Sequence, residues 1–162
     1  MQLEVVMMMK YEQLLDEAFR QNIHVIENAN FSSSSDGLIN NDVIGINKNI
    51  RTHSKRACIL AEELGHYYTS TGNILDPNNI NNRKQEHIAR MWAYDKLIGL
   101  KGIISAFESG CKNTYETAQF LDVTEEFLIE AIDAYKSRYG IFARLDNYAI
   151  YFIPSLGVMK LI

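Results

Sequence analysis

The stretch Ala61-Glu62-Glu63-Leu64-Gly65-His66 decides the fold, because the apolar residues around it recur at helical spacing. A stripe repeating every three or four residues predicts a helix with one buried face. Thr52 or Ser54 can begin this helix, since a hydroxyl at its first position accepts hydrogen bonds from free backbone N–H groups. The predicted stripe consists of Ala57, Leu60, Ala61, Leu64 and Tyr68.

Two acids and a histidine lie within about one turn of this predicted helix. Glu62 and His66 are four residues apart and project from one face, so both can reach a single cation, whereas Glu63 lies roughly 100° around the helix. This is the spacing of a zinc-binding HExxH helix with glutamate in place of the first histidine. By itself, the same spacing also fits a solvated acidic face that binds no metal.

A second helix is predicted over residues 83–97, after a loop of about a dozen residues rich in asparagine at 71–82. Glu86 lies near the start of this helix, and the loop is long enough to return the helix beside the first one. A zinc site needs a third protein ligand, which Glu86 can supply. The apolar residues expected to face inward are Ile88, Met91, Trp92 and Leu97.

The two helices together resemble the ImmA/IrrE family of metallo-endopeptidases. The resemblance rests on a helix that ends in Leu-Ala-Glu-Glu-Leu-Gly-His, followed by the pattern Glu86-x-x-Ala89-x-x-Trp92-Ala93. It implies a zincin-like core in which His66 and Glu86 bind zinc and Glu63 is the catalytic acid. Glu62 occupies the position of the first metal-binding histidine and is the remaining candidate ligand. The resemblance also implies a protein substrate, a transcriptional repressor of a phage or mobile element, which is cleaved to derepress that element.

Glu62 departs from the family pattern, and the departure leaves two functional hypotheses open. A carboxylate is an acceptable zinc ligand, but two carboxylates beside one imidazole cancel the formal charge of the ion and lower its Lewis acidity. The first hypothesis is therefore a zinc-dependent endopeptidase. The alternative is a catalytically impaired or inactive family member that regulates a repressor by binding to it.

The rest of the chain predicts an α+β fold that is mainly helical. A first amphipathic helix runs from Tyr11 to about Asn22, and short β-branched segments at 23–27, 38–39 and 43–46 predict a small antiparallel sheet. We expect a peptidase-like core over residues 1–100. Residues 101–162 are expected to form a C-terminal helical segment that ends in a short strand or hairpin near 148–153 and packs on the core as one unit.

The C-terminal segment has the pattern of a helix-turn-helix, with a helix at 114–120, a turn at 121–123 and a longer helix capped by Thr124. Glu125 and Glu126 in the first turn of that longer helix would face phosphates in a DNA groove, which disfavours DNA binding. The net charge of −4 points the same way. We therefore expect a structural or protein-docking role here, with no nucleic-acid partner.

Composition limits the remaining possibilities. With 162 residues, of which 47% are hydrophobic and 22% charged, the chain should form one globular unit. Cys58 and Cys111 form no CxxC pair, so a reducing cytoplasm is the expected location, and Cys58 should be a small buried hydrophobe.

The apolar run at residues 5–9 is too short for a membrane span. The sequence does not indicate an oligomeric state. The histidines not expected to bind metal are His24, His53 and His87.

Overall fold

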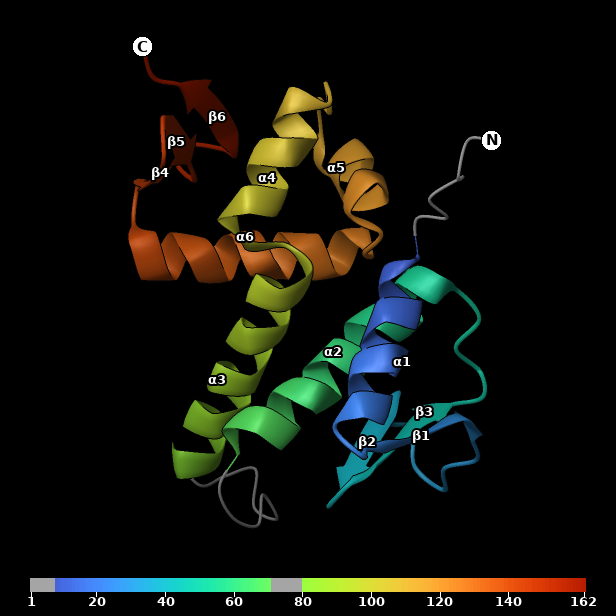
Figure 1. Ribbon diagram of the computed structural model, residues 1–162. Coiled ribbons are helices and arrows are strands. Elements are labelled where there is room, and N and C mark those ends of the chain that lie inside the picture. Colours follow the sequence, from blue (N-terminus) through green and yellow to red (C-terminus); the bar gives the residue numbers. More distant parts are fainter. Residues whose placement is uncertain (1–7, 71–79) are drawn as a thin grey trace, which may run out of the picture.

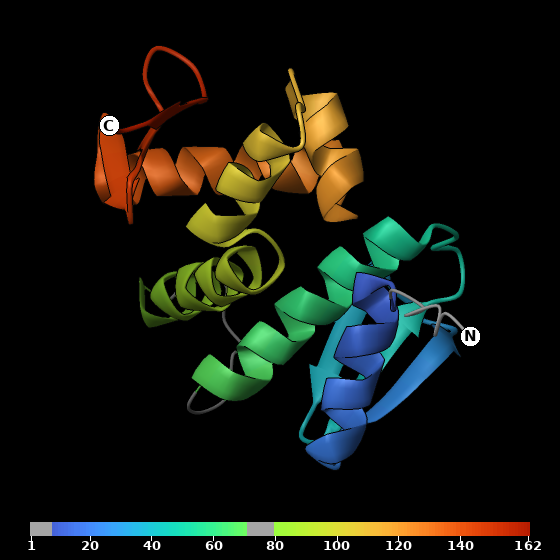
Figure 2. The same cartoon turned by 45° about the horizontal axis from the view of Figure 1, so that its top comes forward.

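The computed structural model describes residues 8–70 and 80–162, and the first half of the chain forms a small sheet covered by two helices (Figure 1). The two helices lie side by side on one face of the sheet in both views (Figure 2). The chain thus begins as a helix-on-sheet layer, which confirms the α+β class for this half. Its elements are α1 (Lys10–Arg20), β1 (His24–Ala29), β2 (Gly37–Asn40), β3 (Val43–Asn47) and α2 (His53–Thr69).

The first sheet is mixed, so the prediction of an antiparallel sheet is wrong for one of its two strand pairs. The strand order is β1-β3-β2, with β2 antiparallel to β3 and β1 parallel to β3. Residues 30–36 carry the chain past the end of β3, which places β2 on its far side. The β-branched segments show where strands form, but their pairing depends on packing, and the central strand buries Ile44 and Ile46 completely.

The second half contains helices and a second sheet, and it completes the α+β fold. In Figure 1, α6 runs across the ends of α3 and α4, and the second sheet lies beside α4 and the C-terminal end of α6. This sheet is an antiparallel meander in the order β4-β5-β6. The elements are α3 (Ile80–Leu97), α4 (Gly99–Glu108), α5 (Thr114–Leu121), α6 (Glu125–Tyr139), β4 (Phe142–Leu145), β5 (Tyr148–Tyr151) and β6 (Gly157–Lys160).

Helix α2 lies at the centre of the molecule, in contact with α1, with strands β2 and β3, and with α3. The predicted apolar stripe is confirmed at Ala57, Leu60, Ala61 and Leu64, which are fully buried, but not at Tyr68, which is 38% exposed. Burying the two leucines stabilises the fold by about 2 kcal/mol each. The helix that carries the Glu-Glu-x-x-His stretch is therefore fixed by packing on several sides.

Helix α3 differs from its prediction at its start and along its buried face. It begins at Ile80, three residues before the predicted start at Arg83. The prediction that Ile88 faces inward is wrong, since that side chain is 50% exposed. Ala89 and Ala93 are buried instead, because α3 approaches α2 along a face of small side chains that allows close contact. Met91 and Leu97 are buried as predicted, and Trp92 is half-buried.

The predicted helix–turn–helix spacing is present in α5 and α6. Thr124 caps α6, and its Oγ1 accepts a hydrogen bond from the backbone N–H of Phe127 at 3.2 Å. Asp122 ends α5 in the left-handed conformation, with φ of 56°. The strand predicted near 148–153 is β5, and β4 and β6 flank it.

Within residues 8–70 and 80–162, no helix is long and apolar enough to cross a membrane. Two predictions concern segments that the structure does not fully describe. The apolar run at residues 5–9 lies mostly outside the described residues, and so do positions 71–79 of the predicted loop.

Candidate active site

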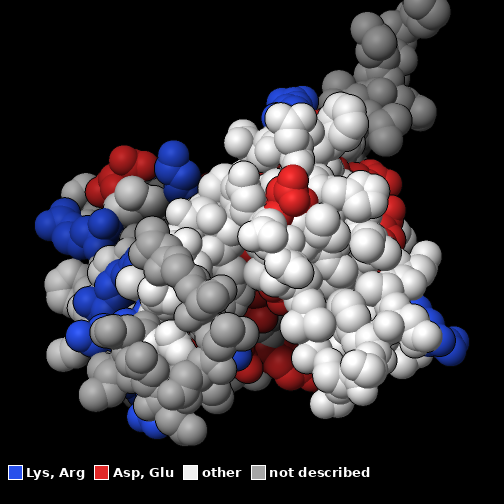
Figure 3. All heavy atoms as spheres, turned by 90° about the horizontal axis from the view of Figure 1, so that it is seen from below, with Lys and Arg blue, Asp and Glu red and all other residues white. Residues whose placement is uncertain are grey.

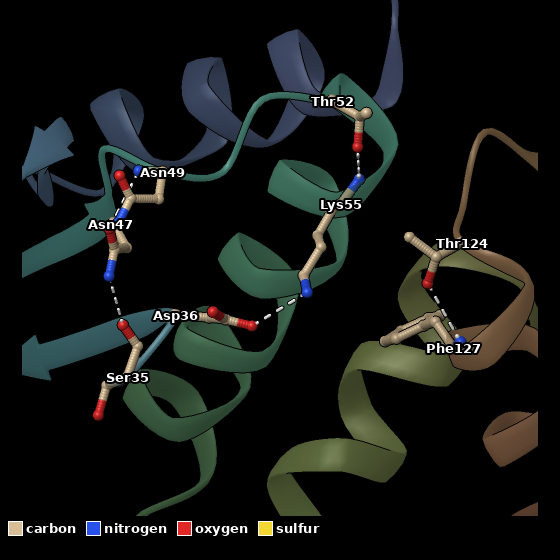
Figure 4. Close-up of polar contacts among 8 residues, drawn as sticks. All are labelled: Ser35, Asp36, Asn47, Asn49, Thr52, Lys55, Thr124 and Phe127. Atoms are coloured by element: carbon tan, nitrogen blue, oxygen red, sulfur yellow. Dashed lines mark hydrogen bonds and ion pairs between the residues drawn. The ribbon is translucent and has the colours of Figure 1, made fainter. Parts of the chain in front are cut away.

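The start of α2 sets which face each side chain of the motif presents. Thr52 is the N-cap, and its Oγ1 accepts a hydrogen bond from the backbone N–H of Lys55 at 3.3 Å (Figure 4). Ser54, the other predicted cap, instead donates its hydroxyl to Asp122 Oδ1 at 3.0 Å, which ties α2 to the turn before α6. With the apolar stripe turned toward the core, Glu62 and Glu63 are left half-buried beside it.

Helices α2 and α3 touch at Gly65, and this contact brings the predicted ligands together. A Cβ atom at Gly65 would lie 2.3 Å from the carbonyl oxygen of Ala89, so only glycine allows the two backbones to come this close. His66 follows this glycine on α2, and Glu86 precedes Ala89 by three residues on α3. His66 Nε2 and Glu86 Oε2 are consequently 3.1 Å apart.

The His66–Glu86 contact shifts the pKa of both groups toward their charged forms. The hydrogen bond to Glu86 raises the pKa of His66, although burial opposes this shift. The hydrogen bond from His66 lowers the pKa of Glu86, again against the effect of burial. The His66 side chain is only 14% exposed, and its Nδ1 is buried without a hydrogen-bond partner among the described residues.

Glu63 is half-buried against the first residue of β2. A Cβ at Gly37 would lie 2.9 Å from Glu63 Oε1, which shows how closely this carboxyl group packs against the sheet. Burial raises the pKa of Glu63 to about 7, while the nearby His66 lowers it and Glu62 raises it further. A carboxyl group with a pKa near neutral can both accept and release a proton at physiological pH.

Glu62 lies close to a positive charge that the chain itself supplies. Burial raises its pKa, and the nearby positive charge of Arg90 is the largest opposing influence. Arg90 also donates a hydrogen bond from Nε to Glu86 Oε1 at 3.2 Å. One guanidinium group therefore pairs with Glu86 and lowers the pKa of Glu62 through its charge. The sequence analysis missed Arg90; the signal that could have found it is its spacing of four residues from Glu86.

A cleft of about 580 Å³ opens beside Glu62 and Glu63, between α2, the start of β2 and the start of α6. Figure 4 shows residues from its two sides: Asp36 and Lys55 face each other on one, and Thr124 and Phe127 belong to the other. We call this the acidic cleft, because its lining includes five acids. They are Asp36, Glu62, Glu63, Glu126 and Glu130.

The three histidines that were not expected to bind metal lie outside this arrangement, and so does Tyr68. His24 and His53 are exposed, and His53 makes an edge contact with the Tyr11 ring. His87 is also exposed, although it follows Glu86 directly. Tyr68 donates its hydroxyl to Glu17 Oε1 at 3.3 Å and packs its ring on Trp92.

Cys58 lies in the lining of the acidic cleft but has the properties of a buried hydrophobe, as predicted. It is 5% exposed, and burial raises the pKa of its thiol to about 11. A thiol with so high a pKa is not a nucleophile near neutral pH. The structure therefore gives no support to cysteine-based chemistry at this site.

The donor atoms at the α2–α3 contact fit a divalent metal ion in part. An imidazole nitrogen of His66 and a carboxylate oxygen of Glu86 are both zinc ligands, and they converge from separate helices. Among the described residues, however, no three His, Cys, Asp or Glu side chains come together closely enough to hold an ion. The structure thus unites two of the three predicted ligands and leaves Glu62 outside that pair.

The family model described as IrrE N-terminal-like domain, Peptidase M78, matches residues 18–133. This range spans α2, α3 and most of α6, and so it includes both the His66–Glu86 pair and the acidic cleft. Neither the curated proteins nor the solved structures contain a significant match.

Proposed function

Because the chain belongs to the IrrE N-terminal-like domain family of M78 peptidases, we propose that it is a metal-dependent endopeptidase with a zincin-like core and its active site at the α2–α3 contact. The observation that carries this proposal is the 3.1 Å contact between His66 Nε2 and Glu86 Oε2, two metal-binding groups from separate helices. Glu63, whose pKa lies near 7, is on the same helix as His66.

His66 and Glu86 would hold the ion, with Glu62 as its third protein ligand. Zinc suits this set of one imidazole and two carboxylates. When bound, such an ion supplies a Lewis acid that polarises the scissile carbonyl and makes water a better nucleophile. For Glu62 to bind the metal, its carboxylate must turn away from the positive charge of Arg90 and toward the ion.

Glu63 acts as the general base. It takes a proton from the attacking water as the water oxygen bonds to the carbonyl carbon of the peptide. It then gives that proton to the amine nitrogen as the C–N bond breaks, so the carboxylate is regenerated at the end of each cycle. Burial favours this role, because it brings the pKa of Glu63 to the pH at which both transfers must occur.

The substrate is a protein, and we propose a transcriptional repressor of a phage or mobile element in the cytoplasm. Residues 1–100 form the peptidase core in this proposal, and residues 101–162 pack on that core as one unit. Helix α6 of the second segment lines the acidic cleft beside Glu63, so the C-terminal segment forms part of the substrate site.

One observation favours the alternative, a regulator that binds a repressor without cleaving it. Arg90 already provides a positive charge to Glu62 and Glu86, the two carboxylates that would otherwise balance a metal ion. Because the Arg90 side chain already balances these carboxylates, the site can be stable without a metal ion. A protein with such a metal-free site would regulate the repressor by binding it.

Metal analysis and peptide hydrolysis together test the proposal. Purified wild-type protein should contain stoichiometric zinc and cleave a mixed-sequence peptide library, with products identified by mass spectrometry. Glu63→Gln should retain zinc and lose at least about a hundredfold in rate, and His66→Ala should lose the metal. Unchanged hydrolysis by Glu63→Gln would refute the role of Glu63, and a stable, metal-free wild type with no hydrolysis would favour the regulator.

A further inference from the structure

The acidic cleft carries more negative charge than the proposed chemistry needs. Hydrolysis requires the acids of α2, but Glu126 and Glu130 project into the same cleft from α6, one helical turn apart. Figure 3 shows acidic side chains gathered in a hollow of the face seen from below, with a largely uncharged surface to its right. Glu126 and Glu130 thus line the cleft without a role in the proposed bond cleavage.

The charges in the cleft are only partly balanced by the chain itself. Lys55 pairs with Asp36 at 3.2 Å, and Arg90 acts on Glu62. Among the described residues, neither Glu126 nor Glu130 takes part in an ion pair within 4 Å. These two carboxylates are consequently free to attract a positive group from outside.

Glu130 is also held in position by a neighbour. The Tyr94 hydroxyl donates a hydrogen bond to Glu130 Oε2 at 3.2 Å, and Tyr94 is itself buried and packed edge-on against Phe127. Fixing a carboxylate before the ligand arrives lowers the entropy cost of binding. Glu126 lies in the first turn of α6 and lines the same cleft.

The spacing of these acids suits long cationic side chains better than a metal ion. In residues 8–70 and 80–162, no three acids, histidines or cysteines are close enough to share one ion, so the acids of the cleft do not form a chelating cluster. A cleft of about 580 Å³ is large enough for several side chains of an extended peptide. Lysine and arginine reach separate carboxylates through flexible stems and cover the apolar wall with those stems.

We infer that the acidic cleft binds a segment of the protein substrate rich in lysine or arginine, and that Glu126 and Glu130 determine this preference. The inference rests on the proposed function, because it places the scissile peptide bond beside Glu63. The two residues act on binding through charge, and neither takes part in bond cleavage.

Fluorescence anisotropy tests the inference without requiring hydrolysis. The probes are two fluorescein-labelled peptides of the same length, one with a pair of adjacent lysines and one with glutamines in their place. Both are titrated with the full-length Glu63→Gln protein, with and without the further changes Glu126→Gln and Glu130→Gln. The matched control is Asp133→Asn, which removes one negative charge from an exposed position of α6 outside the cleft.

The lysine peptide should bind more tightly than the glutamine peptide, and the difference should shrink as salt is added. Removing both glutamates should weaken lysine-peptide binding by roughly fivefold to tenfold, whereas Asp133→Asn should change it by less than about twofold. Thermal unfolding of each variant separates a binding effect from a folding defect.

Equal binding of the two peptides would overturn the inference, and so would an equal loss in Asp133→Asn. The binding assay also distinguishes failure of this inference from failure of the proposed function. If the wild type binds the lysine peptide in this way but cleaves no peptide, the cleft preference holds and the peptidase proposal fails. If the wild type cleaves peptides but shows no preference for basic residues, the peptidase proposal holds and the cleft inference fails.

Discussion

Helix α2 meets two neighbours in different ways. Against α3 it packs backbone to backbone, with no space for a methyl group between Gly65 and Ala89. Toward α6 it faces a cleft of about 580 Å³ lined with carboxylates. The first contact fixes the distance between candidate ligands, and the second leaves space for a substrate. The comparison shows that one helix can hold a tight helix–helix contact on one face and border an open cleft on another.

The largest expected effect is a loss of stability, and a pair of matched glycine-to-alanine substitutions compares the two faces of α2. Gly65→Ala should destabilise the protein by about 3 kcal/mol, because the added methyl group meets the Ala89 backbone, which cannot move without shifting α3. Gly37→Ala on the cleft side should cost less, about 2 kcal/mol. The added methyl group meets side chains, with Ile59 Cγ2 at 2.5 Å and Glu63 Oε1 at 2.9 Å, and the stiff Ile59 cannot rotate away, but the edge strand β2 can shift more easily than the α3 backbone. Urea denaturation measures both.

Gly157→Ala is the control for this pair, because no heavy atom lies within 4 Å of the added Cβ. Its stability should stay close to that of the wild type. Equal losses in Gly65→Ala and Gly37→Ala would mean that the α2–α3 contact is no more rigid than the cleft wall.

The second prediction concerns the pH dependence of stability. Burial raises the pKa of Glu63 from its ordinary value of 4.5 to about 7, so the folded protein keeps a proton that the unfolded chain releases. Stability from this group is present below pH 4.5 and is lost as the pH rises through about 7. In metal-free protein, the free energy of unfolding should fall by on the order of 2 kcal/mol across this window because of Glu63.

The Glu63→Gln variant should lack that part of the pH dependence, as measured by urea denaturation in the presence of a chelator. His66 adds a decrease of the same sign above pH 6.5, because its pKa is raised, and the variant retains the Glu86 contact. Glu12→Gln, at an exposed position of α1, should leave the wild-type slope unchanged. If Glu63→Gln keeps the full wild-type slope, the carboxyl group is not buried as described.

The third prediction tests whether Arg90 competes with a metal at the α2–α3 contact. Arg90→Gln removes the positive charge bonded to Glu86 Oε1 and frees that oxygen, so zinc should bind about fivefold more tightly. Arg83→Gln makes the same change at an exposed position of the same helix and should have little effect. Calorimetric zinc titration measures both, and weaker binding by Arg90→Gln would show that Arg90 supports the site.

The smallest expected effect concerns the hydrogen bond that joins the start of α2 to the turn before α6. Ser54→Ala removes the donor to Asp122 Oδ1 and should cost about 1 kcal/mol of stability. Ser105→Ala, at an exposed position of α4, provides the control for a serine-to-alanine change within a helix. Thermal unfolding compares the two variants. Identical unfolding midpoints would show that the Ser54–Asp122 hydrogen bond does not stabilise the protein.

Several features of the fold could be read from nearby residues alone. The apolar stripe of α2, the Thr124 cap and the strand near 148–153 depend on residues within one or two turns of each other. The structure confirms them, except that Tyr68 of the stripe is exposed. The family was also predicted correctly from the order and spacing of two short motifs. Local hydrogen bonding and side-chain periodicity were sufficient in each of these cases.

Other features could not be predicted because they depend on distant segments. The parallel pairing of β1 with β3 and the exposure of Ile88 follow from how the sheet and α3 pack against α2. The charge that Arg90 presents to Glu62 depends on the α2–α3 crossing. The roles of Glu62, Glu63, His66 and Glu86 in metal binding and catalysis stay predictions.

The sequence by itself determined the position of α2, the cap of α6, the family and the candidate catalytic residues, since each is specified by short-range spacing. Only the tertiary structure decided which groups meet. It paired His66 with Glu86 across a glycine contact and placed Glu126 and Glu130 of α6 across a cleft from Glu63. The physical reason is that side chains from separate helices come together only through close packing of whole elements, which no local pattern encodes.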